Sequence, residues 1–519
     1  MSDKETFEIE LRGMSKKFGG LYANRDATLS VKKGEIHALV GENGAGKTTL
    51  MKLLYGMYRP DGGEMLLRSK QVRFDSPAGA IAARIGMVHQ HFMLVKTLTV
   101  AENVVLGQEI VKAGIFLDSS LAEAETALLI KKFNLALDPK ALAANLSVGE
   151  QQRLEILKIL YRKADILILD EPTAVLTPQE TAGLFAILKS LRDEGKTIVL
   201  ITHKLKEVIS ISDSVTVMRQ GRTVGSVKTA GTSESQLAQL MVGRPVVFEV
   251  GKKPLPAGEL ETRPAVLEIS GLKARSTKGH YALDGFELVV KKGEIFGIAG
   301  VEGNGQSELI EIITGLKKPQ AGTMKLNGEL LGLANASPRL LFDKGVAHIP
   351  EDRHKRGLVL DYSVADNLVL GRHREKTFSR PALINFDAIN DFAGKMTTAF
   401  NIQPQRFELP ARSLSGGNQQ KVVVAREFSR QPKLLIASQP TRGVDVGAIE
   451  FIHKKIIEAR DAGCAVLLLS AELSEIMSLS DRIGVIYRGR VAGIFSSGEA
   501  TEEQLGLLMM SGAEKRLKA

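Results

Sequence analysis

The stretch Gly41-Glu42-Asn43-Gly44-Ala45-Gly46-Lys47-Thr48 fits the pattern G-x-x-x-x-G-K-[ST]. It follows the short apolar run 36–40 and precedes 47–55, where apolar residues recur at helical spacing. The glycines let backbone N–H groups close around phosphates, and the start of a helix adds a partial positive charge. The stretch therefore predicts a phosphate-binding loop, with Lys47 against the β- and γ-phosphates and the Thr48 hydroxyl on Mg²⁺.

Two adjacent carboxylates, Asp170 and Glu171, follow the apolar run 166–169. A carboxylate at the end of a strand can reach a magnesium ion bound beside the phosphate loop. A carboxylate one residue later can polarise the attacking water as a general base, which contributes ~10²–10⁴-fold to the rate. Taken alone, the pair could be a solvated acidic strand end. Together with the phosphate loop, it predicts hydrolysis of a nucleoside triphosphate.

Continuous apolar runs of strand length occur at 166–169 and 198–201. Such runs are typical of a largely parallel sheet whose two faces are both covered. Residues 215–224 contain the turn Arg219-Gln220-Gly221-Arg222 between apolar segments, which predicts a hairpin. The expected fold class is α/β.

The chain is a duplication. Lys-Gly-Glu occurs at 33–35 and again at 292–294, an offset of 292 − 33 = 259 that Gly86 and Gly345 keep. Later pairs are shifted further, because a Leu-Ser pair recurs at an offset of 414 − 146 = 268. The second half should therefore carry a net 268 − 259 = 9 extra residues between Gly345 and Leu414.

Residues 244–263 separate the two halves and combine several prolines with charged residues. This composition predicts an exposed linker between a first domain, 1–243, and a second, 264–519. The one cysteine, Cys464, excludes an internal disulfide framework and a cysteine-based zinc cluster. It precedes the apolar run 465–469 and is expected in the core.

The formal charge is 69 − 59 = +10, which suits either a well-solvated surface or attraction to an anionic membrane or nucleic acid. No apolar run approaches the ~18 residues needed to span a bilayer. The charged start of the chain leads into no apolar segment, so no signal peptide is expected. Any work at a membrane would then depend on partner proteins.

The segment Leu146-Ser147-Val148-Gly149-Glu150-Gln151-Gln152 resembles the signature L-S-G-G-Q of ABC cassettes, with valine at the third position. Gln90 matches the Q-loop glutamine of that family, His203 the switch histidine, and Phe18 the aromatic residue that stacks on adenine. The resemblance covers essentially the whole chain, twice. It implies two tandem ABC-type P-loop NTPase cassettes, each with a largely parallel sheet core, an antiparallel β part and a helical subdomain.

The second half lacks the chemical groups of the first. Gln306 stands where the first half has Lys47, and Ser438-Gln439 stands where it has Asp170-Glu171. Ala471 takes the place of the histidine, and Glu351 lies near the Q-loop position. Losing one such donor typically costs ~3–4 kcal/mol of transition-state stabilisation. Hydrolysis in the second cassette is therefore expected to be negligible.

The second half nevertheless keeps Leu414-Ser415-Gly416-Gly417-Asn418-Gln419-Gln420, a nearly unaltered signature. Asp445 matches the D-loop aspartate of the family, where the first half has Thr177. ABC cassettes pair head to tail, so the resemblance implies one competent composite site, formed by the first phosphate loop and the second signature.

The expected ligands of this site are ATP and Mg²⁺. The residues expected to act are, in catalysis, Lys47, Gln90, Glu171 and His203; in ATP binding, Phe18, Gly41, Asn43, Gly44, Gly46, Lys47, Thr48, Thr49, Ser415, Gly416, Gly417 and Asp445; and in Mg²⁺ binding, Thr48, Gln90 and Asp170.

Fused cassettes with a degenerate second half resemble the ATPases of bacterial importers for nucleosides and for monosaccharides. Segments 87–104 and 437–441 resemble the nucleoside branch, associated with basic membrane proteins, more closely. The resemblance implies two transmembrane permease subunits, an extracytoplasmic substrate-binding protein, and a peripheral position on the cytoplasmic face of the cell membrane without nucleic acid. Monosaccharide import is the alternative. A ribosome- or DNA-associated twin-cassette ATPase is a further rival, but such proteins usually have a long helical arm or zinc cysteines.

Overall fold

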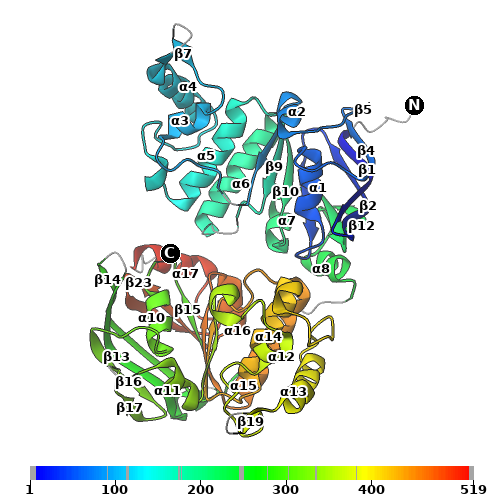
Figure 1. The fold of residues 1–519 in the computed structure, drawn as a ribbon. Coiled ribbons are helices and arrows are strands. Elements are labelled where there is room, and N and C mark those ends of the chain that lie inside the picture. The colour runs from blue at the N-terminus through cyan, green and yellow to red at the C-terminus, as the bar shows by residue number, and fades with distance from the viewer. Residues whose placement is uncertain are drawn as a thin grey trace. The chain divides into compact units, whose positions relative to one another are not determined.

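A computed structural model gives the fold of the chain in two compact units, residues 1–246 and 247–519 (Figure 1). The structure describes residues 7–90, 92–112, 116–173, 176, 178–244, 251–256, 258–276, 279–301, 303–333, 336–380 and 383–512.

The first unit is built around a six-stranded sheet, in which all neighbouring pairs are parallel except the pair formed by the edge strand β12. Its strands, in spatial order, are β12 (Arg222–Lys228), β11 (Ser214–Arg219), β3 (Ile36–Gly41), β10 (Thr197–Ile201), β9 (Ile166–Asp170) and β6 (Ile85–Val88). The expected parallel core is thus confirmed, and β11 and β12 form the expected hairpin.

The central strands are buried on both faces, and their side chains alternate between two apolar cores. Ile166 and Ile168 of β9 pack in one core with helix α1 (Lys47–Leu54) and the antiparallel sheet. Leu167 and Leu169 pack in the other core, with helices α5 (Val148–Tyr161) and α6 (Pro178–Asp193). This explains why the strands read as continuous apolar runs, since each face needs its own apolar partner.

An antiparallel sheet and a group of helices complete the first unit on opposite sides of the main sheet (Figure 1). The antiparallel sheet has the order β2 (Leu21–Lys32), β1 (Phe7–Phe18), β4 (Gly62–Leu67) and β5 (Lys70–Gln71). The helical part comprises α3 (Val100–Val105), α4 (Ser119–Lys132) and α5 (Val148–Tyr161). The remaining elements are α1 (Lys47–Leu54), α2 (Pro77–Ala82), β7 (Val111–Lys112), β8 (Phe116–Leu117), η1 (Ala143–Asn145), α6 (Pro178–Asp193), α7 (Leu205–Ile211) and α8 (Glu234–Val242).

The second unit repeats this architecture. Its main sheet has the order β18 (Val346–Ile349), β21 (Leu434–Ser438), β22 (Ala465–Leu469), β15 (Ile295–Ala299), β23 (Arg482–Tyr487) and β24 (Arg490–Ser496). Its antiparallel sheet has the order β14 (Tyr281–Lys291), β13 (Ala265–Arg275), β16 (Ala321–Leu326) and β17 (Glu329–Leu331). The other elements are α9 (Glu259–Thr262), α10 (Gln306–Ile313), α11 (Pro338–Asp343), η2 (Arg353–Gly357), α12 (Val364–Leu368), β19 (Ser379–Arg380), β20 (Leu383–Ile384), α13 (Phe386–Ala399), η3 (Ala411–Ser413), α14 (Gly416–Phe428), α15 (Val446–Asp461), α16 (Leu473–Leu479) and α17 (Glu502–Ser511).

Strand register corrects one part of the predicted repeat. Val88 pairs with Leu169 and Ile349 with Ala437, so strands β6 and β18 correspond at an offset of 349 − 88 = 261. Gly345 therefore corresponds to Arg84 and not to Gly86. Both Arg84 and Gly345 adopt positive φ, 64° and 87°. Two of the nine extra residues thus precede Gly345, which spacing alone could not reveal.

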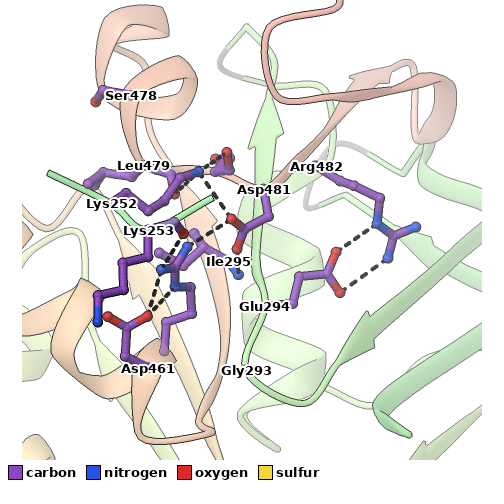
Figure 2. A network of polar contacts seen from close by, with 12 residues as sticks. Lys252, Lys253, Gly293, Glu294, Ile295, Asp461, Ser478, Leu479, Asp481 and Arg482 are labelled. Atoms are coloured by element: carbon purple, nitrogen blue, oxygen red, sulfur yellow. Dashed lines mark hydrogen bonds and ion pairs between the residues drawn. The ribbon is translucent and has the colours of Figure 1, made fainter. Parts of the chain in front are cut away.

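The predicted linker lies partly outside the described residues, at 245–250 and 257. Apart from Arg244, its described part belongs to the second unit, where the Lys252 side chain is only 12% exposed and forms an ion pair of 3.1 Å with Asp481. Lys252 also donates to the carbonyls of Leu479 and Ser480 at 3.2 and 2.6 Å (Figure 2). The expectation of an exposed linker is wrong at Lys252, because a charged side chain can be covered when its donors are paired.

Cys464 is buried, as expected. Within the described ranges of the chain, no helix has the length and apolar character that crossing a membrane requires.

Candidate functional site

The glycine-rich loop joins strand β3 to helix α1. Gly46 adopts φ 95°, and a Cβ there would collide with the Ala23 carbonyl and lie 2.6 Å from Asn24 Nδ2. Asn24 Nδ2 also donates to the Gly46 carbonyl at 3.0 Å. Glycine is therefore required at position 46 both by backbone conformation and by space. Asn24 supports this loop from 22 residues away and belongs to no motif, so no local sequence pattern predicts its role.

Lys47 lies buried inside the loop. Its ammonium donates to the carbonyls of Gly41 and Glu42 at 2.7 and 3.0 Å. Burial lowers the pKa of Lys47, and the charges of Glu171 and Asp170 oppose this shift. The ammonium therefore sits among backbone oxygens that phosphate oxygens could replace.

Thr48 and Asp170 meet at the carboxyl end of strand β9. The Thr48 hydroxyl donates to Asp170 Oδ1 at 3.2 Å. Burial raises the pKa of Asp170, whereas the hydrogen bond from Thr48 lowers it. A hydroxyl and a buried carboxylate are hard oxygen donors of the kind that Mg²⁺ prefers. These two residues thus fit the metal expected from the sequence.

Glu171 is held between two other predicted site residues. Its Oε2 accepts from Gln90 Nε2 at 2.9 Å, and its Oε1 lies 3.0 Å from Nδ1 of His203. Its backbone has φ 48°, which is unusual for a residue other than glycine, and its N–H donates to the Ile201 carbonyl at 2.9 Å. The tertiary fold therefore fixes both the main chain and the carboxylate.

Opposing effects set the pKa of Glu171. Burial raises it, but the hydrogen bond with His203 and the charges of His203, Lys47 and Lys204 outweigh burial, so the net shift is downward. The carboxylate is therefore ionised at neutral pH, as a general base must be.

Other predicted ATP ligands lie outside this cluster. Phe18 is 45% exposed at the end of β1, and its ring meets that of Tyr58 edge-on at a centroid distance of 5.1 Å. Asn43 is exposed on the loop, and Thr49 is half-buried in α1. Their roles remain predictions.

The second unit keeps the loop backbone but not the cation. Gly305 has φ 105°, close to the 95° of Gly46. Gln306 Nε2 donates to the Gly300 carbonyl at 2.9 Å, so a neutral amide makes the contact that the ammonium of Lys47 makes in the first unit.

At the strand end of the second unit, a neutral side chain likewise stands where the first unit has a charged one. Gln439 has φ 46° and donates its N–H to the Leu469 carbonyl at 2.7 Å, so its main chain repeats that of Glu171. Its side-chain Oε1 accepts from the N–H of Ala471 at 3.1 Å. The position thus has the geometry of the first site without its carboxylate.

The signature residues lie at helix N-termini. Ser415 caps α14, and its hydroxyl accepts from the Asn418 N–H at 3.4 Å. Asp445 caps α15 by accepting from the Ala448 N–H at 2.7 Å, and its carboxylate lies where a Cβ at Gly417 would be. The second unit therefore brings Ser415, Gly417 and Asp445 together, 445 − 415 = 30 residues apart. Ser147 caps α5 in the same way, and Thr177 lies outside the described residues.

The fold and these sites define a protein with two P-loop nucleotide-binding cassettes. The family model described as ABC transporter matches residues 24–174 and 283–442, and the chain belongs to this family. It is accordingly an ATP-binding protein and an ATPase of the ABC transporter type.

Three relatives match nearly end to end. The guanosine import ATP-binding protein NupO of Bacillus subtilis is 50% identical over 509 residues, 98% of either chain. The nucleoside import ATP-binding protein NupA of Lactococcus lactis is 47% identical over 504 residues, 97% of this chain and 98% of that one. The glucose import ATP-binding protein TsgD13 of Haloferax volcanii is 44% identical over 535 residues, 98% of this chain and 96% of that one.

A solved structure with two cassettes is also similar. It is the complex of the archaeal ribosomal stalk protein aP1 with the archaeal ribosome recycling factor aABCE1, at 19% identity and a TM-score of 0.57, covering 91% of this chain and 87% of that chain. At this identity the similarity concerns the fold alone.

Proposed function

We propose that this chain is the ATP-hydrolysing subunit of an importer for nucleosides. The observation that carries the proposal is the arrangement around Glu171. The carboxylate is ionised, held by Gln90 and His203, and one residue from the Thr48–Asp170 pair.

In this proposal Lys47 binds the β- and γ-phosphates through its ammonium. Thr48, Asp170 and Gln90 would hold Mg²⁺, which when bound neutralises phosphate charge. The hydrogen bond between Gln90 and Glu171 uses the amide nitrogen, so the amide oxygen is the atom available for a metal. Glu171 orients the attacking water and accepts its proton, while His203 keeps the carboxylate oriented and ionised.

In this proposal, the signature of the second cassette completes the binding site of the ATP held by Lys47. The distribution of changes supports this. The complete phosphate loop lies in the first cassette, whereas the unaltered signature glycine, Gly416, and the aspartate Asp445 lie in the second. The reverse combination would join Gln306 to a signature with Val148, so the losses gather in one of the two composite sites.

Nucleosides are the favoured substrates because the relatives at 50% and 47% identity are named for the import of guanosine and of nucleosides, respectively. The relative at 44% identity is named for glucose, which makes monosaccharide import the second candidate. Two permease subunits, an extracytoplasmic binding protein and a peripheral position on the cytoplasmic membrane face complete the proposed system. The formal charge of +10 is compatible with an anionic membrane surface.

The test is uptake into vesicles that hold the purified chain with its permeases and binding protein. ATP-driven accumulation of radiolabelled guanosine, lost in Lys47→Ala, is the expected result. The matched control is Gln306→Ala, which should retain uptake because that loop has no cation to lose. Accumulation of glucose or ribose without guanosine would contradict nucleoside import, and equal loss in both variants would contradict a single competent site.

A further inference from the structure

A short segment of the second cassette reaches the signature turn. It follows strand β18 and contains Glu351, Asp352 and the π-helical turn η2. Asp352 caps this turn by accepting from the N–H groups of His354 and Lys355 at 2.9 and 3.1 Å. Arg353, the first residue of the turn, is thereby fixed with its side chain directed toward helix α14.

The Arg353 guanidinium joins two loops that lie far apart in the sequence. Its Nη1 donates to the Arg442 carbonyl at 3.0 Å, and its Nη2 to the Gly443 carbonyl at 3.5 Å. Its Nε donates to Oε1 of Gln419, in helix α14, at 3.3 Å. All three acceptors are neutral oxygens. Burial lowers the pKa of Arg353, and the charge of Asp352 opposes that shift.

The signature glycines make room for this arrangement. A Cβ at Gly416 would lie 2.7 Å from Nη2 of Arg353 and 3.0 Å from the Gly443 carbonyl. A Cβ at Gly417 would collide with the Asp445 carboxylate. Gly416 therefore leaves space for the Arg353 guanidinium, and Gly417 leaves space for the Asp445 carboxylate.

The first cassette lacks both the arginine and the glycine that correspond to Arg353 and Gly416. Val148 occupies the position of Gly416, at an offset of 416 − 148 = 268. Lys158 donates to the Met93 carbonyl and the corresponding Arg426 to the Gly357 carbonyl. The segment from strand β6 to Met93 is therefore three residues shorter than the segment from β18 to Gly357, and it contains no arginine. The cation and the glycine that accommodates it thus occur together in the second cassette and are both absent from the first.

We infer that Arg353 is a positioning residue for ATP hydrolysis, which holds the signature turn at Ser415–Gly417 and the D-loop at Gly443–Asp445 as one rigid unit. The inference rests on the proposed function, in which this signature completes the ATP site of the first cassette. Arg353 acts through the two loops, because three of its N–H groups are already donated to protein oxygens.

The first test compares Arg353→Ala with Lys355→Ala in the full chain assembled with its permeases. Lys355 lies in the same turn and is exposed, so its removal should leave ATPase activity unchanged. Arg353→Ala should lower kcat about 10- to 100-fold, because small displacements of positioned groups are costly. KM for ATP should change less than threefold, since Lys47 and its loop are untouched. Arg353→Lys, which keeps the charge but cannot bridge both carbonyls, should recover only part of kcat.

The second test is a double-mutant cycle. Gly416→Ala alone should lower kcat, because the new methyl group meets the guanidinium. In the Arg353→Ala background the same substitution should have a much smaller effect, so the two changes should be non-additive. A merely structural contribution of Arg353 to folding would not produce this coupling.

The outcomes separate the inference from the proposed function. Wild-type kcat in Arg353→Ala, or additive effects in the cycle, would overturn the positioning role while Glu171→Gln still abolishes hydrolysis. ATP hydrolysis that survives Glu171→Gln would instead overturn the proposed function itself.

Discussion

The two cassettes have the same main chain at their nucleotide sites and different side chains. Glu171 and Gln439 have φ values of 48° and 46°, and each donates its N–H to the neighbouring parallel strand. Lys47 and Gln306 both cross their loops to a glycine carbonyl. Glycines, strand register and buried apolar residues thus maintain the site geometry, whereas a few charged side chains decide whether chemistry occurs there.

The cassettes also differ away from these sites. Arg192 pairs with Asp213 at 3.4 Å, and the two side chains are 28% and 41% exposed. The corresponding Arg460 and Asp481 pair at 3.0 Å, but are only 1% and 6% exposed. The difference arises because residues 252–253 cover this surface in the second cassette: Arg460 donates to the Lys253 carbonyl at 3.0 Å, and Lys252 pairs with Asp481.

The largest expected effect concerns the strand-end residues. Glu171→Gln should lower the ATPase rate by ~10²–10⁴-fold, because the base is lost while the groups that bind ATP remain. Gln439→Ala, at the corresponding position, should leave most of the activity. Steady-state phosphate release by the full transporter measures both. Comparable losses in the two variants would remove the functional distinction between the cassettes.

A second experiment substitutes the signature serine of each cassette in turn. Ser415→Arg should reduce hydrolysis by roughly 100-fold, since a bulky cation removes a donor and blocks approach to the γ-phosphate. Ser147→Arg, in the cassette that holds Glu171, should reduce it much less. Both serines cap helices, so each variant loses a similar cap. If the Ser147 variant were the more damaged one, each cassette would work alone.

A third prediction concerns stability. Arg460→Ala should lower the free energy of unfolding of the second cassette by about 1.5–3 kcal/mol, because the buried carboxylate of Asp481 loses one of its two cationic partners and keeps only Lys252. Arg192→Ala should cost the first cassette at most about 1 kcal/mol, as expected for a partly exposed pair. Urea unfolding followed by hydrogen exchange in peptides from each cassette distinguishes them. Equal costs would mean that residues 252–253 do not change the energetics of the pair.

The smallest effect is expected at Cys464, which is buried in the second cassette. Burial raises the pKa of its thiol to about 12, so almost no thiolate exists at pH 8. Iodoacetamide should therefore leave the native chain unmodified and label it fully after denaturation. Labelling should become faster in Arg460→Ala and stay slow in Arg192→Ala. Rapid labelling of the native wild-type chain would contradict the packing around Cys464.

Much of the nucleotide site could be predicted from sequence because its determinants are local. The loop at 41–48 fixes a turn and a helix start through contiguous glycines, and the apolar run before Asp170 predicts a buried strand. The parallel order of β9 and β10 then brings Glu171 to His203, 203 − 171 = 32 residues later. Losses in the second half were visible for the same reason, since corresponding local patterns could be compared position by position.

The sequence by itself thus determined the duplicated α/β fold, the phosphate loop and the missing charges of the second cassette. Only the tertiary structure decided that Gly345 corresponds to Arg84, that Lys252 is covered, and that Arg353 meets Gly416 across 416 − 353 = 63 residues. Strand register, side-chain burial and close approach depend on how distant segments pack. No local pattern of residue types records the distance between two such segments, because that distance is set by the whole core.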